Sequence, residues 1–338
     1  MMHLVNRTPF KAFALPAICH QDNHHVVVIV KGTFDIGDTT HGPFLAAEQA
    51  EINLADVYWG ELGKFSLQYE ADTAISKPGT DVAMIGKARA PRGPVRQLDV
   101  GLRVGSLSKV VRVFGNRYWV KTASGWSMTA PEPFEVMPLV YEFAYGGTDP
   151  WQEPDGPPDF DQRNPVGRGY AGPRSHQATD RIPLPNIELP DQLITDIRQR
   201  PEPAGFGFIA RNWQPRSLLM GTYDENWEKQ RNPLLPGDFD PVCYAAASDG
   251  LRADHYFAGG EAVAISNVSA NGQMNFTLPG NRVKVVSYIN QQRLEHDTVM
   301  DTVVIEPLRN RVMLTWRVAI RCHWNLSMIE WLKVLEVQ

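Results

Sequence analysis

Apolar and polar residues alternate along both ends of the chain, and this pattern predicts β-strands. Val26 to Val30 form an unbroken β-branched run that precedes Gly32, which is typical of a buried strand. Further along, Leu98, Val100, Leu102 and Val104 alternate with polar residues or glycine, so a second strand with one buried face is predicted there.

Two hairpins follow from the same period of two. Residues 109–114 and 117–121 read as strands joined at Gly115-Asn116, a residue pair that can adopt a tight turn. Near the end of the chain, residues 299–305 precede a turn at Leu308 to Asn310, and apolar residues then alternate with polar ones over 312–320. This last segment is the clearest hairpin pattern in the sequence.

Signals for helices are few. A short helix is predicted over 190–197, where a proline begins the segment and apolar residues recur three and four positions apart. Thr222 and Glu225 have the spacing of a capping box, so a brief helix through Trp227 is expected. Ile329, Leu332 and Leu335 suggest a final helix.

Residues 146–204 form a long segment rich in glycine, proline and aspartate that still contains Trp151, Phe160 and Tyr170. Its aromatic content favours an ordered, packed loop region over a flexible linker. The whole chain is therefore expected to be mainly β, a β-sandwich-like fold or two packed β lobes with a long ordered loop region and few short helices. Residues 1–338 form one unit, with 1–145, 146–204 and 205–338 as sub-lobes.

Composition narrows the class of protein. Apolar residues make up 43% and charged residues 21% of the chain, as in globular proteins, and the net charge of -5 gives no basic surplus for binding nucleic acid. The first residues are interrupted by Pro9 and Pro16 and predict neither a signal peptide nor membrane insertion. Three widely separated cysteines predict neither disulfides nor zinc. These features indicate a cytoplasmic protein without metal or cofactor.

Motifs of catalysis are missing from the sequence. No GxSxG elbow or complete phosphate-binding loop occurs, and the GxG of Arg163 to Tyr170, RNPVGRGY, is not followed by a helical pattern. Two Asp-Phe-Asp triplets supply the carboxylates for an alternative site, namely Asp159, Asp161, Asp238 and Asp240. Paired carboxylates can hydrolyse glycosides. In loops of this composition they more often cap turns or pair with arginines.

Aromatic and arginine residues in the loops favour a binding surface instead. Both types are enriched at protein interfaces. The predicted partner-binding residues are Arg168, Tyr170, Trp213, Tyr223 and Trp227.

A series of short motifs resembles one bacterial family. The motifs are KPGTDVAMIGKARAP, VRQLDVGLRVGSLSKVVRVFGNRYW, MPLVYEFAYGGTD, NPVGRGY, LPNIE and WQPRSLLMGTYDENWEKQRNPLLPGDFDPVCYAAA. The family was first catalogued as a domain of unknown function, and its members are often encoded beside type VI secretion genes for the spike and for PAAR-repeat tip proteins.

The resemblance implies an adaptor or chaperone that binds a toxic effector, a PAAR protein or the spike in the cytosol of a Gram-negative bacterium and helps to load the effector. It assigns no catalytic residue. Two alternatives remain open at this point: a carbohydrate-active β-sandwich hydrolase that uses the loop aspartates, and a structural component of the secretion machine. The sequence predicts neither the oligomeric state nor the effector.

Overall fold

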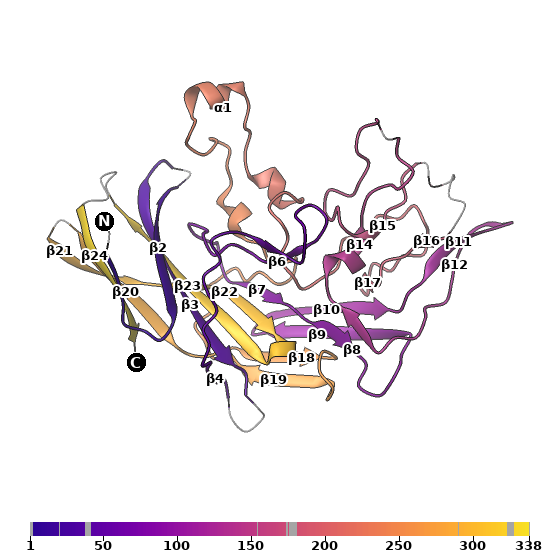
Figure 1. The fold of residues 1–338 in the computed structure, drawn as a ribbon, viewed down its shortest axis with the longest axis horizontal. Coiled ribbons are helices and arrows are strands. Elements are labelled where there is room, and N and C mark those ends of the chain that lie inside the picture. The colour runs from indigo at the N-terminus through magenta and orange to yellow at the C-terminus, as the bar shows by residue number, and fades with distance from the viewer. Residues whose placement is uncertain are drawn as a thin grey trace.

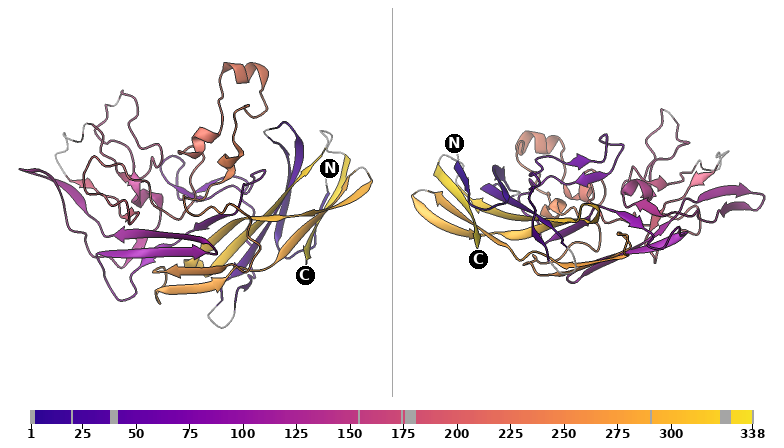
Figure 2. Two further views of the ribbon diagram at one scale, coloured as in Figure 1. Left: turned by 180° about the vertical axis from the view of Figure 1, so that it is seen from behind. Right: turned by 60° about the horizontal axis from the view of Figure 1, so that its bottom comes forward.

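A computed structural model describes residues 3–19, 21–37, 42–153, 155–173, 175, 181–289, 291–322 and 328–337 of the chain. The fold is mainly β, as predicted, and consists of several open sheets with one short α-helix. The sheets lie in a row along the long axis, and most of the irregular segments gather on one side of them (Figures 1 and 2).

A six-stranded sheet occupies the middle of the molecule. Its order is β2-β3-β23-β22-β7, and β4 adds to the end of β3. These strands are β2 (Lys11–Ile18), β3 (His24–Asp35), β4 (Phe44–Leu45), β7 (Asp81–Met84), β22 (Val299–Glu306) and β23 (Arg311–Arg321). The predicted strand at 26–30 lies within β3. The predicted hairpin at the end of the chain is also confirmed, because β22 and β23 pair antiparallel around a turn in which Asn310 is left-handed.

Two further sheets flank this one. The first has the order β1-β24-β20-β21, with β1 (His3–Asn6), β20 (Arg282–Ile289), β21 (Gln292–Asp297) and β24 (Ile329–Val337). The second has the order β17-β10-β9-β18-β19, with β9 (Gln97–Val104), β10 (Leu107–Phe114), β17 (Ile187–Glu188), β18 (Ala262–Ser266) and β19 (Gln273–Thr277). The strand predicted from Leu98 to Val104 is β9.

Smaller elements complete the fold. Short sheets are formed by β12 (Gly125–Met128), β11 (Tyr118–Thr122) and β16 (Ile182–Pro183), by β13 (Val136–Pro138) and β8 (Lys87–Arg89), by β14 (Tyr145–Gly146) and β15 (Arg168–Gly169), and by β5 (Val57–Tyr58) and β6 (Leu67–Tyr69). The helix α1 covers Glu225–Gln230, and 3-10 turns cover η1 (Tyr141–Phe143), η3 (Arg216–Leu219), η4 (Pro241–Tyr244) and η5 (Pro307–Arg309).

The largest hydrophobic core lies where the three main sheets meet. One face of the six-stranded sheet contributes alternate residues such as Val28, Val30 and Leu314. Val285 and Leu332 come from the sheet with β24, and Leu102 comes from the sheet with β9. Because this one cluster contains residues of all three sheets, the sheets share a common core.

Both ends of the chain supply strands to the same sheets. Among the described residues, β3 pairs with β23, β9 pairs with β18, and β1 pairs with β24. Segments 1–145 and 205–338 are therefore interleaved through backbone hydrogen bonds, whereas residues 146–204 contribute short strands and loops.

Three predicted elements are wrong. The 190–197 segment contains turns and no helix. Residues 329–335 belong to β24, a central strand that has partners on both sides and cannot be a helix. Gly115-Asn116 does not close a hairpin, because β10 pairs with β9 across the turn at Gly105, where φ is +55°, and β11 pairs with β12.

The short helix predicted near Trp227 is present but begins later than expected. Asp224, and not Thr222, is its N-cap, and the Asp224 side chain accepts a hydrogen bond from the backbone N–H of Trp227. The helix stands away from the sheets, and irregular segments of the chain lead to it and away from it (Figure 1). We call residues 217–240 the α1 arm.

Candidate functional site

The second face of the six-stranded sheet carries buried charges. Lys31 on β3 contacts the Asp72 carboxylate at 2.8 Å, and Arg317 on β23 contacts Asp301 at 2.5 Å. All four side chains are buried. Segments 46–80 and 204–250 cover this face and supply further charged residues to the same network of ion pairs.

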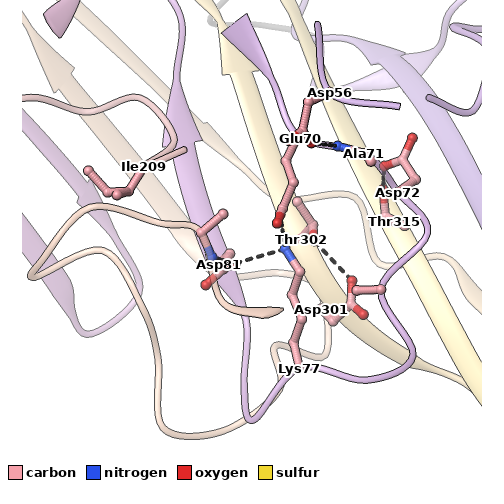
Figure 3. Close-up of polar contacts among 12 residues, drawn as sticks. Asp56, Glu70, Ala71, Asp72, Lys77, Asp81, Ile209, Asp301, Thr302 and Thr315 are labelled. Atoms are coloured by element: carbon pink, nitrogen blue, oxygen red, sulfur yellow. Dashed lines mark hydrogen bonds and ion pairs between the residues drawn. The ribbon is translucent and has the colours of Figure 1, made fainter. Parts of the chain in front are cut away.

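Lys77 is at the centre of this network (Figure 3). Its Nζ lies 2.7 Å from Glu70 and 2.8 Å from Asp81, and Arg216 contacts the other oxygen of Glu70 at 2.8 Å. Burial alone would raise the pKa of Glu70, but the two cations outweigh burial and hold its pKa below the usual range. Burial would lower the pKa of Lys77, yet its carboxylate partners raise it. Both groups are therefore charged at neutral pH.

Little open space exists in this network. The cavity lined by Lys31, Glu70 and Lys77 has a volume of about 10 Å³, which is room for one water molecule at most. A substrate cannot reach these charges. Their role is to fix the covering loops to the sheet through ion pairs.

The RNPVGRGY segment is likewise an internal part of the fold. The Asn164 side chain is fully buried and donates to the carbonyls of Tyr141 and Tyr145 at 2.8 and 2.9 Å. Gly146 has φ of +143°, and a Cβ there would lie 2.2 Å from the Asn164 carbonyl oxygen. Within the motif, a Cβ at Gly167 would lie 2.8 Å from the Ala144 carbonyl oxygen, so close backbone contact explains this glycine too.

Arg168, a predicted partner-binding residue, makes internal contacts. Its Nε donates to the Glu142 carbonyl at 2.9 Å, its Nη1 donates to Asn186 at 3.0 Å, and its guanidinium lies over the Phe143 ring. Tyr170 is partly buried, and its hydroxyl donates to Asp159 at 2.5 Å. Burial and this hydrogen bond raise the pKa of Tyr170 to about 12.

The remaining predicted aromatic residues divide into buried and exposed. Trp213 is buried and packs edge-on against Tyr141, with 5.7 Å between ring centroids, so its ring does not reach the surface. Tyr223 is exposed on the α1 arm and stacks edge-on against Trp227 at 4.7 Å. Trp227 donates its indole N–H to the Leu234 carbonyl, which stiffens the arm. Among the predicted partner-binding residues, Tyr223 and Trp227 therefore contact each other on the α1 arm.

The four loop aspartates also accept internal hydrogen bonds. Asp161 is paired with Arg163 at 2.5 Å, and Asp159 accepts from Tyr170. Asp238 caps the backbone N–H of Thr222, and Asp240 caps Val242 at the start of η4. One pair belongs to the loop region and the other to the α1 arm. Each carboxylate thus has a turn, an arginine or a tyrosine as its partner.

A hairpin with exposed apolar side chains lies next to the charged face of the six-stranded sheet. It was not predicted from the sequence. Segment 54–65, which we call the apolar hairpin, includes β5 and the turn before β6. Its exposed large apolar side chains are Leu54 (58%), Val57 (39%), Trp59 (43%), Leu62 (67%) and Phe65 (43%). Scattered exposed apolar residues are ordinary, but five within twelve positions mark a candidate interaction site.

The base of the apolar hairpin is firmly held. Ser66 donates its N–H and hydroxyl to the two oxygens of Glu142, at 2.8 and 2.7 Å. Asp56 accepts from the N–H of Ala71 at 2.8 Å (Figure 3). In the ribbon, the segment before β6 lies between the α1 arm and the loops around β14 and β15 (Figure 1). A rigid base therefore presents apolar side chains on the loop side of the molecule. Clustered tryptophan, leucine and phenylalanine around Gly60 and Gly63 could have indicated this site in the sequence.

Other classes of site find no support in the part of the chain that the structure describes. No three His, Cys, Asp or Glu side chains there are grouped to hold a metal ion, and the three cysteines are free. None of the helices there has the length and apolar character needed to cross a membrane.

Comparison with known proteins gives one result. A search of curated proteins found no significant match, and a search of solved structures found none. The family described as "Uncharacterized protein conserved in bacteria (DUF2169)" matches residues 21–317. Because this match covers most of the chain, the protein belongs to the bacterial DUF2169 family.

Proposed function

We propose that this protein is an adaptor that binds another protein in a type VI secretion pathway and helps to load an effector onto the spike. The observation that carries the binding role is the apolar hairpin, whose exposed side chains stand on an ordered base. The secretion pathway rests on the gene neighbourhood that the family resemblance implies. The proposed partners are a secreted effector, a PAAR protein or the spike itself.

The alternative of a glycoside hydrolase has less support. General acid and base catalysis requires two carboxylates that face a substrate cleft. Asp161 is instead paired with Arg163, and Asp238 accepts from both the N–H and the hydroxyl of Thr222. These contacts are those of turn-forming residues.

Affinity capture tests the adaptor. The tagged full-length protein is expressed in the cytosol of its native bacterium, recovered after mild cross-linking, and its partners are identified by mass spectrometry. We expect a PAAR-bearing effector or a spike protein in amounts comparable to the bait. Recovery of no secretion component by the folded protein would refute the proposal. Stoichiometric incorporation into the assembled particle would instead identify a structural subunit.

A variant and a matched control locate the binding surface. Trp59→Ser with Leu62→Ser removes two exposed side chains of the apolar hairpin, and we expect capture to fall about tenfold or more, as for interface hot spots. Leu308→Ser is the control, because Leu308 is 57% exposed and lies in the turn between β22 and β23. Equal loss in both variants would argue against a specific role of the hairpin.

A further inference from the structure

A pocket under the α1 arm has the size of one large side chain. Its volume is about 130 Å³, close to that of a dry cavity that holds a benzene molecule. Met220, Leu235, Phe239 and Tyr244 form most of its apolar lining, and Tyr223 stands at its side. Because Tyr223 stacks on Trp227 and Asp238 caps Thr222, the wall formed by the arm is ordered.

Arg211 gives this pocket a partly exposed cation that is only weakly paired. The Nε of Arg211 is buried, yet among the described residues it has no hydrogen-bond partner. Its contact with Asp56 is a long one, 3.8 Å from Nε to Oδ2. The Nε itself is enclosed, but the Arg211 side chain as a whole is 39% exposed, so an arriving carboxylate would contact the guanidinium from its exposed side.

The other charges near the pocket are already paired. Arg216 donates to the Cys243 carbonyl, the Ile209 carbonyl and Glu70. Burial raises the pKa of the Cys243 thiol to about 11, so this group is neutral. Arg211 is therefore the group in the pocket lining that is suited to recognise a negative charge.

The pocket and the apolar hairpin are linked by the contact between Arg211 in the pocket lining and Asp56 in the hairpin segment. Asp56, the residue that Arg211 approaches, directly precedes Val57 at the start of the hairpin. A bound chain could therefore contact the pocket, the guanidinium and the hairpin together. The apolar side chains at both ends exclude a fully polar ligand, and the cation between them favours an acidic one.

We infer that this surface binds an extended polypeptide segment of the partner, with a large apolar side chain in the pocket and a nearby Asp or Glu carboxylate on Arg211. Flanking apolar residues of the segment contact the apolar hairpin. This inference rests on the proposed adaptor function for the identity of the partner, but the recognition chemistry follows from the pocket.

Selection from a peptide library tests the inference directly. The immobilised full-length protein is exposed to a displayed library of random dodecapeptides, and enriched sequences are synthesised for binding measurements. We expect a large aliphatic or aromatic residue within a few positions of Asp or Glu. The Asp→Asn or Glu→Gln form of each peptide should bind roughly 10- to 100-fold more weakly, the effect of a charge-assisted hydrogen bond.

The Arg211→Gln variant completes the test. Arg211 is partly exposed and weakly paired, so this change should leave the fold intact, which circular dichroism verifies. We expect the variant to bind the acidic and neutral peptides equally. Absence of any enriched peptide, or an unchanged preference for the acidic form, would overturn the inference. Arg309→Gln, an exposed arginine in η5, serves as the charge control.

The two proposals can fail separately. If secretion proteins are captured as well by Arg211→Gln as by the unaltered protein, the adaptor stands and this surface is refuted. If acidic peptides bind through Arg211 but no secretion component is captured, the surface stands and the adaptor is refuted.

Discussion

Lys77 shows at the scale of one residue how a buried charge determines stability. Its Nζ contacts both Glu70 and Asp81 in the interior of the protein. We expect Lys77→Met to lower the free energy of unfolding by about 3 to 5 kcal/mol, because Asp81 would be left buried without its cation and Glu70 would keep only Arg216. Equilibrium unfolding in urea, followed by circular dichroism, measures the change.

An exposed lysine supplies the control for this prediction. Lys64 contacts Glu61 at 2.8 Å, but its side chain is 68% exposed. Lys64→Met should change the free energy of unfolding by less than about 1 kcal/mol, since solvent screens such pairs. Similar losses in both variants would mean that burial does not determine the strength of these ion pairs.

Glu70 makes part of the stability depend on pH. Its pKa in the folded protein lies below the ordinary value of 4.5, so its contribution is fully present above that pH and is lost as the pH falls through the folded pKa. We expect Glu70→Gln to cost about 3 to 5 kcal/mol at pH 7 and progressively less below pH 4.5. Urea unfolding of both proteins from pH 7 to pH 3 measures the difference. A difference that grows on acidification would contradict the lowered pKa.

At the scale of an element, the junction of β14 and β15 depends on Gly146. A side chain there would meet the Asn164 carbonyl oxygen, and the backbone has a positive φ. Gly146→Ala should lower the free energy of unfolding by at least about 1 to 3 kcal/mol. Gly237→Ala is the control, because a Cβ at Gly237 has no heavy atom within 4 Å. Thermal unfolding of the two variants checks the contrast, and equal midpoints would contradict it.

Elements whose pairing is local could be predicted from the sequence, and elements whose pairing is distant could not. The β22–β23 hairpin is local, and its alternation from Val312 to Ile320 identifies both strands. The register of β24 depends on β1 and β20, which are distant in sequence, and its leucines have spacings that also suit a helix. The turn at Gly115-Asn116 has suitable residues, but its flanking strands find better partners elsewhere.

Only part of the candidate surface could be predicted from the sequence. The short helix through Trp227 was predicted correctly, since its signals belong to one local segment, but the contact between Tyr223 and Trp227 was not predicted. The isolated donor of Arg211 could not be found, because its environment combines residues 56, 211 and 239 from separate parts of the chain. Likewise, burial of Trp213 follows from its packing on Tyr141, which the residue type does not reveal.

At the scale of the whole molecule, the interleaved strands predict one cooperative unit. Residues 1–145 expressed alone would lack β23, β18 and β24, the partners of β3, β9 and β1. Their apolar faces would be exposed along unpaired strand edges, so we expect this fragment to be unfolded or aggregated. Circular dichroism and size-exclusion chromatography of the fragment test this.

Complementation of two fragments provides the decisive comparison. Residues 1–204 and 205–338, expressed together, retain every one of these pairings, and the cut falls outside the main strands. We therefore expect the two fragments to elute as a 1:1 complex and to unfold in a single transition by both fluorescence and circular dichroism. If residues 1–145 folded alone, or if the intact protein unfolded in two steps, the shared sheets would not couple the two ends of the chain. Loss of the complex on adding Arg216→Met would further show that the buried ion pair between Glu70 of the first fragment and Arg216 of the second connects the fragments.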